Sequence, residues 1–132
     1  MSASVVDEII ASLPSGLDRA VLRILDFHKG REHAIGRADL VRDLAGMGYR
    51  VSERAAREQI SLLRKAGSLI CSAPGRDGGY WLAASREEYE DFKHQEYLAK
   101  INDMRETLAA MDQAAERTWG KYSPAKQPSL FG

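Results

Sequence analysis

Cysteine is almost absent from this chain. Cys71 is the only one among 132 residues, so no disulfide can form within one chain. A lone thiol is typical of a reducing compartment, where disulfides are rare. The N-terminal residues also lack the basic-then-apolar pattern of a secretory signal, because Asp7 and Glu8 interrupt the only apolar stretch there. We therefore expect a cytoplasmic protein.

Long hydrophobic runs are missing as well, and so is an excess of charge of one sign. No apolar stretch approaches the length of about 20 residues that a membrane-spanning helix needs, so we expect no membrane partner. Lys+Arg and Asp+Glu each number 19, which argues against bulk polyanion binding but leaves room for a local basic patch. Hydrophobic content of 44% and charged content of 29% fit one globular domain with an appendage.

Patterns of catalytic and metal-binding residues are also absent. His28, His33 and His94 are scattered, and no Cys–His pair has the spacing of zinc ligands. Residues 75–79 are rich in glycine, but no Lys-Ser or Lys-Thr follows them as in a phosphate-binding loop. No nucleophile and base stand in a recognisable arrangement. We predict a protein that is not an enzyme and that uses no cofactor and no metal.

Hydrophobic periodicity predicts a mainly α fold with a small β-hairpin. Helical spacing recurs in four segments before residue 67, and the pattern then changes to a hairpin whose strands are residues 68–72 and 80–83. The second helix is expected to run from Leu17 to Lys29, with Phe27 and His28 extending its apolar stripe, and to end at Gly30. Ser52 is expected to cap the fourth helix.

A capping box beginning at Ser85 predicts one long helix that continues to about Thr118. Apolar side chains alternate along it at spacings of four and three, which is the pattern of a coiled-coil seam. The seam predicts a homodimer, although the same stripe would also suit packing on the domain itself. Its residues are Tyr97, Ile101, Met104, Leu108 and Met111.

The fourth predicted helix carries arginine on a side away from its apolar residues. Arg54, Arg57 and Arg64 share this stripe with Ser61, and Ser52 precedes it at the cap. A guanidinium group can bond to guanine in the major groove or pair with phosphate. At the hairpin tip, Arg76 is the only cation among glycines. These six residues are the predicted contacts to double-stranded DNA.

Two stretches carry a resemblance to a known class of proteins. Residues 52–67 follow the pattern Ser-x-Arg-x-x-Arg-x-x-Ile-x-x-Leu-Arg-x-x-Gly, and residues 78–83 read Gly-Gly-Tyr-Trp-Leu-Ala. They resemble small winged helix-turn-helix proteins of bacteria and their phages or prophages. The resemblance implies a DNA-binding domain, which we place at residues 17–84, and a helix that follows it, here the long helix over 85–119. The N-terminal helix over 1–16 is predicted by the helical spacing of the apolar residues from Val5 to Leu13.

The last residues form an apolar ending that the preceding pattern does not require. Residues 120–132 are expected to be a flexible tail, yet they end in Gln-x-Ser-Leu-Phe-Gly. This spacing resembles the peptide by which bacterial replication and repair proteins dock on the DNA sliding clamp. The matching residues are Gln127, Ser129, Leu130 and Phe131, while Pro128 departs from the usual second position.

These observations predict a DNA-binding winged-helix accessory protein of replication or repair. Its partners would be double-stranded DNA, the sliding clamp and a second copy of itself. Two alternatives stay open. One alternative is a winged-helix transcriptional regulator with an incidental tail. The other is an adaptor for other proteins that does not bind DNA.

Overall fold

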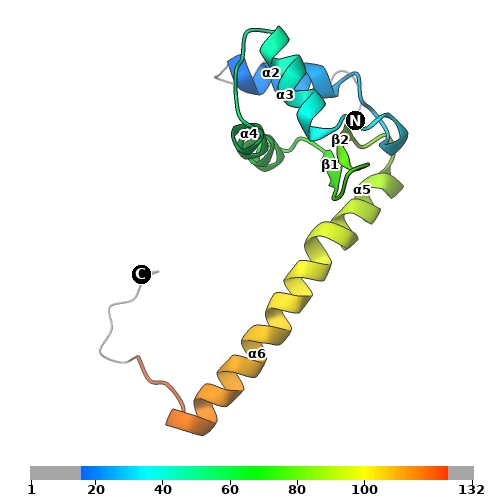
Figure 1. The fold of residues 1–132 in the computed structure, drawn as a ribbon. Helices are drawn as coiled ribbons and strands as arrows, with labels where there is room; N and C mark the ends of the chain where they lie inside the picture. The colour runs from blue at the N-terminus through cyan, green and yellow to red at the C-terminus, as the bar shows by residue number, and fades with distance from the viewer. Residues whose placement is uncertain (1–15, 125–132) are drawn as a thin grey trace. The chain divides into compact units, whose positions relative to one another are not determined.

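The computed structural model describes residues 16–124. Almost all of the predicted N-terminal helix, residues 1–15, therefore lies outside the described residues, and so do the four clamp-peptide residues. The described chain divides into two units, one ending at His94 and the other beginning at Gln95. The predicted class, mainly α with a small antiparallel hairpin and a long C-terminal helix, is confirmed (Figure 1).

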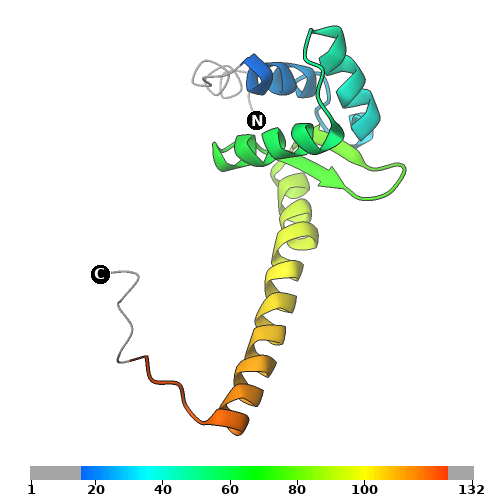
Figure 2. The same ribbon diagram turned by 60° about the vertical axis from the view of Figure 1, so that its left-hand side comes forward.

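Three helices enclose the main core of the first unit (Figure 2). They are α2 (Gly16–Leu25), α3 (Arg37–Gly46) and α4 (Glu53–Lys65). Each contributes an apolar face at helical spacing, and these faces meet because burying them removes apolar area from water. The fully buried side chains of the three helices include Leu22, Leu25, Leu40, Leu44, Ile60 and Leu63.

Strand β2 (Gly79–Leu82) is hydrogen-bonded along both edges. On one edge it pairs with β1 (Ile70–Ala73) in an antiparallel hairpin. On the other edge, the N–H and C=O of Tyr80 both bond to Ile35 at 2.9 Å. The backbone of Leu82 on that edge accepts from Gly30 and donates to His28, again at 2.9 Å. The segment around residues 28–35 therefore covers this edge of the two-stranded sheet through two isolated bridges, a parallel one at Lys29 and an antiparallel one at Ile35.

This edge pairing corrects the predicted length of α2. The helix was expected to reach Lys29 but ends at Leu25. The backbone groups of His28 and Gly30 are used by Leu82, which a continued helix would not allow. Phe27 was expected in the apolar stripe, but it falls in the turn after the helix and is 85% exposed. Ile35 forms an antiparallel bridge with Tyr80, preceded by a short 3₁₀ turn, η1 (Arg31–His33).

The hairpin is buried on both faces. Ile70, Tyr80 and Leu82 belong to the three-helix core. Cys71 and Trp81 point the other way and form a second cluster with Ala83 and Phe92, the latter on α5 (Arg86–Phe92). Burial, as the largest cause, raises the pKa of the Cys71 thiol to about 11. The thiol is therefore protonated and unreactive at neutral pH.

The long C-terminal helix is not one regular helix, contrary to expectation. Its start is as predicted, because Ser85 Oγ accepts from the N–H of Glu88 at 3.2 Å. After α5 the backbone takes π-helical hydrogen bonding over η2 (Lys93–Leu98) and then continues as α6 (Ala99–Trp119). Side-chain periodicity reports which face is apolar and not which carbonyl each N–H selects. The sequence pattern therefore could not reveal the π segment.

Two glycines allow the close approach of backbone segments around the hairpin. A Cβ atom on Gly79 would collide with the carbonyl oxygen of Ile35. One on Gly78 would collide with the carbonyl oxygens of Ala73 and Pro74. The Gly-Gly pair is therefore a steric requirement of pairing β2 on both edges.

We expect Gly79→Ala to lower the free energy of unfolding by about 2–4 kcal/mol, because the new methyl group would push β2 away from residue 35. Chemical denaturation followed by circular dichroism measures this. The matched control is Gly46→Ala at the end of α3, where a Cβ meets nothing within 4 Å. That variant should be neutral or stabilised by up to about 1 kcal/mol. Equal effects of the two substitutions would contradict the steric argument.

Candidate nucleic-acid interface

Helix α4 has one buried face and one face in solvent. Its start is set by Ser52, whose Oγ accepts from the N–H of Ala55 at 3.1 Å. Ala56, Ile60 and Leu63 are each at most 2% exposed and attach the helix to the core. Figure 2 shows α4 lengthwise, with the hairpin beside it.

The exposed face of α4 carries part of the predicted arginine stripe. Arg54, Arg57 and Ser61 are all exposed. Arg54 forms an ion pair with Glu58 one turn later, at 3.4 Å, but its side chain remains 83% exposed. An exposed pair of this kind contributes little stability, so the guanidinium of Arg54 can be redirected at low cost. Within residues 16–124, Arg57 has no ion-pair partner within 4.0 Å.

Arg64 lies on the same stripe, but its side chain is turned into the protein. Its Nε donates to the carbonyl of Ile70 at 2.8 Å, and its Nη2 donates to Ser72 Oγ at 3.0 Å. The guanidinium also lies 5.0 Å from the centre of the Phe92 ring. Arg64 thus connects α4 to β1 and to α5. Its guanidinium forms hydrogen bonds with the hairpin, whereas the sequence pattern predicted that Arg64 contacts DNA.

Lys65 is a cation that the sequence reading did not include. It follows Arg54 by eleven residues, which at about 100° per residue brings it back to nearly the same side of the helix. The residue is exposed, as is Ser61 between them. The offsets of seven and eleven from Arg54 were available in the sequence. The sequence prediction instead placed the arginines at offsets three and ten, with Ser61 at seven, on one stripe.

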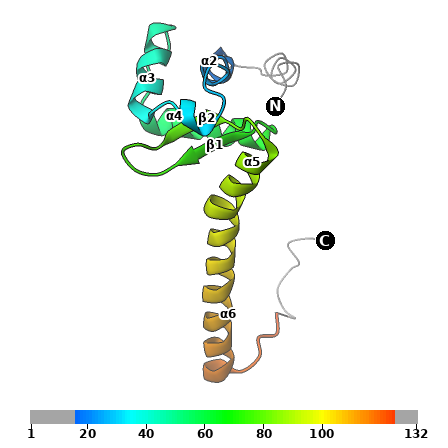
Figure 3. The ribbon, with the colours of Figure 1, turned by 90° about the vertical axis from the view of Figure 1, so that its right-hand side faces the viewer.

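The hairpin tip is exposed and contains Arg76. Residues 74–77 are all exposed, and Gly75 has a φ of 92°, a conformation that favours glycine. At the base of the tip, Arg37 Nη2 donates to the carbonyl of Ala73 at 3.0 Å. The Arg37 guanidinium also lies 5.6 Å from the Tyr80 ring centre. Figure 3 shows the hairpin loop extending on the side where α3 lies.

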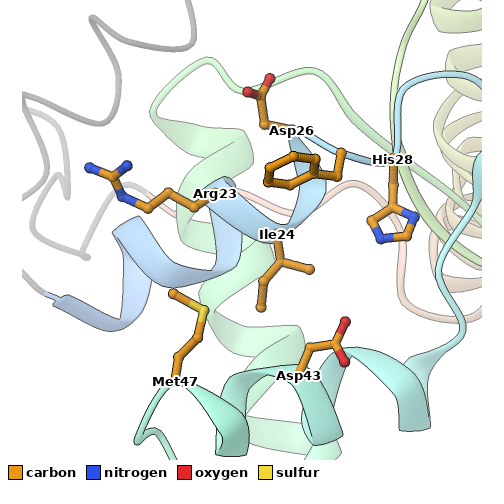
Figure 4. A pocket seen from close by; sticks show the side chains of 7 residues that line it. Arg23, Ile24, Asp26, His28, Asp43 and Met47 are labelled. Atoms are coloured by element: carbon orange, nitrogen blue, oxygen red, sulfur yellow. The ribbon is translucent and has the colours of Figure 1, made fainter.

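A shallow pocket of about 530 Å³ lies on another part of the first unit (Figure 4). It is formed by the ends of α2 and α3, and it includes none of the predicted DNA-contacting residues. Two of its polar side chains have partners: Asp26 Oδ1 lies 3.2 Å from Lys29 Nζ, and His28 Nδ1 donates to the carbonyl of His33 at 2.7 Å. The lining residues are Arg23, Ile24, Asp26, Phe27, His28, Asp43 and Met47.

The residues of the predicted dimer seam belong to other elements than α4 and the hairpin. The dimer-seam residues belong to the second unit: Tyr97 lies in η2, and the other four lie in α6. Among residues 16–124, no group of three or more His, Cys, Asp or Glu side chains is placed to hold a metal ion. Within the same range no helix is both long and apolar enough to cross a membrane.

Comparison with known proteins gives no assignment. No family model, curated protein or solved structure matches this chain.

We expect Arg64→Ala to lower the free energy of unfolding by about 1–3 kcal/mol, because it removes both hydrogen bonds to the hairpin. The control is Lys65→Ala, which removes an exposed cation of equal charge next to it and should change stability by less than about 0.5 kcal/mol. Urea denaturation of both variants measures the difference. A neutral Arg64→Ala would show that the two bonds do not hold the hairpin in solution.

Proposed function

We propose that the first unit binds double-stranded DNA as a winged helix-turn-helix, with α4 as the recognition helix and the hairpin as the wing. The observation that carries this proposal is that the side chains on different sides of α4 have different environments. Its apolar side chains are buried, its outward cations are exposed, and Arg64 between them fastens the hairpin alongside. A helix presented in this way has the shape that enters a major groove.

The DNA-facing residues of the proposal are Ser52, Arg54, Arg57, Ser61, Lys65 and Arg76. Four of them are cations, so about four phosphate contacts are available to each chain. Each neutralised phosphate contributes about −0.9 to the slope of log K against log salt, which gives a slope of about −3 to −4. Glu53 and Glu58 on the same helix reduce the local potential. Binding by one chain should therefore be weak and strongly dependent on salt.

The C-terminal peptide supports a role beside the replication machinery. Gln127, Ser129, Leu130 and Phe131 match the pattern by which proteins dock on the bacterial sliding clamp. The Leu-Phe pair would enter an apolar pocket of the clamp, which could supply about 3–6 kcal/mol before the cost of ordering the peptide. We infer a cytoplasmic accessory factor of replication or repair that is not an enzyme. Clamp docking would concentrate its DNA-binding unit near the duplex.

An adaptor that binds protein instead of DNA is the second candidate. It is favoured by the Arg54–Glu58 pair and by Leu62, an apolar side chain on α4 that is 53% exposed. An ion-paired surface with an exposed leucine also suits a protein partner. The two candidates differ in whether the outward arginines meet phosphate.

We expect Arg54→Ala/Arg57→Ala to weaken binding to duplex DNA by at least about tenfold, since each lost phosphate or base contact costs about 1 kcal/mol or more. Electrophoretic shift or fluorescence anisotropy over a range of salt concentrations measures it. The matched control is Arg86→Ala/Arg117→Ala, which removes the same charge from exposed positions on α5 and α6. If the two double variants lose affinity equally, or if the wild type shows no salt-dependent binding, the adaptor is the better interpretation.

We expect Leu130→Ala/Phe131→Ala to abolish binding to a bacterial sliding clamp, because both apolar anchors are removed. Isothermal titration of the full chain into purified clamp measures the affinity. Pro124→Ala/Lys126→Ala is the control within the same segment and should bind as the wild type does. Equal binding by all three proteins, or binding by none, removes the clamp from the proposal. The outcome is independent of the DNA measurement.

A further inference from the structure

Helix α6 carries an exposed apolar stripe. Ile101, Met104, Leu108 and Met111 follow one another at spacings of three and four, and their exposed fractions are 39%, 69%, 59% and 65%. All four lie within the regular α-helical part, so the preceding π segment does not disturb their alignment. A stripe of large apolar side chains repeating every seven residues is the surface with which two helices form a coiled coil.

The positions that flank the stripe show how a second helix could lie against it. In heptad notation, Ile101 and Leu108 occupy position a, and Met104 and Met111 occupy position d. Arg105 and Asp112 then fall at position e, with Leu98 and Trp119 one heptad before and after them. Lys100, Thr107 and Ala114 fall at position g. Charges at e and g meet the partner helix and set its direction.

A parallel pair would bring like charges together. In that arrangement, a g residue meets the e residue of the next heptad on the partner. Lys100 would face Arg105 of the second copy, and by symmetry this repulsion would occur twice. Asp112 would face Thr107 and would find no cation. The charges of α6 therefore oppose a parallel dimer.

An antiparallel pair would bring opposite charges together. There, e residues meet e residues, and an a residue shares a layer with a d residue of the partner. Placing Leu108 opposite Met111 of the second copy puts Arg105 opposite Asp112, and symmetry makes this attraction occur twice. The same register puts Ala115 opposite Met104, whose flexible side chain can fill the space that a small residue leaves.

We propose that the occupant of this stripe is a second copy of the chain, with the two α6 helices antiparallel and centred between residues 109 and 110. The register also gives a role to Trp119, which is 82% exposed in the single chain. Its indole lies opposite Leu98 of the second copy, at the two ends of the paired segment. The proposal uses none of the DNA-contacting residues, so it and the DNA-binding proposal can fail separately.

Reversal of single charges tests the direction of pairing. Arg105→Asp and Asp112→Arg each replace two attractive contacts of the antiparallel pair by two repulsive ones. We expect each to raise the dimer dissociation constant about ten- to thirtyfold. The double variant Arg105→Asp/Asp112→Arg restores both attractions and should dimerise like the wild type. Sedimentation equilibrium of the full chain at low salt measures all four proteins.

A parallel dimer gives the opposite sign, because Arg105→Asp would then place an aspartate against Lys100 and tighten the association. That result overturns the proposal, and so does a double variant that remains as weak as the single ones. A wild type that stays monomeric at concentrations up to about 100 μM overturns it as well.

Leu108→Asp provides the check on the apolar stripe. It places a charge in the central layer of the pair, and we expect it to give a monomer. Because Leu108 is exposed in the single chain, the thermal unfolding of the first unit should not change. A Leu108→Asp protein that still dimerises with wild-type affinity shows that this stripe is not the interface.

Discussion

The two-edged pairing of β2 is the constraint on which the first unit depends. The N–H and C=O groups of alternate residues in a strand point to opposite edges. The backbone groups of Trp81 therefore face β1, while those of Tyr80 and Leu82 form hydrogen bonds with the segment that follows α2. This pairing ends α2 early, sets where α3 begins and holds the return strand of the hairpin. It requires glycine at position 79, because no side chain fits against the carbonyl of Ile35.

The hairpin also connects the packing of the unit to its candidate function. Because both faces of the hairpin are buried, it cannot tilt freely relative to α4 or α5. Arg64 adds a polar connection at the same junction, with bonds to the carbonyl of Ile70 and the hydroxyl of Ser72. Arg64 thus helps to position the hairpin relative to α4. The outward side chains Arg54 and Arg57 of α4 and residues 74–77 of the tip remain exposed to solvent.

The two units present different kinds of surface. The first offers a few exposed cations, partly offset by Glu53 and Glu58, and so would bind DNA weakly as a single copy. The second offers an apolar stripe with charges that suit an antiparallel partner. Dimerisation would supply two DNA-binding units and two C-terminal peptides in one assembly, and several weak attachments held together bind far better than one. The modest charge of each chain is compatible with function in such an assembly.

Sequence by itself determined the elements and most of the core. The apolar faces of α3 and α4, the Ser52 and Ser85 caps and the hairpin all follow from periodicity and local hydrogen bonding, which act over a few residues. The end of α2, the orientation of Arg64 and the exposure of Phe27 were decided by tertiary structure. Each depends on a partner far along the chain: Leu82 for the end of α2, and Ile70 and Ser72 for Arg64. Arg57 and Arg64 are equivalent in a helical pattern, and only the position of β1 distinguishes the arginine that faces solvent from the one that holds the hairpin.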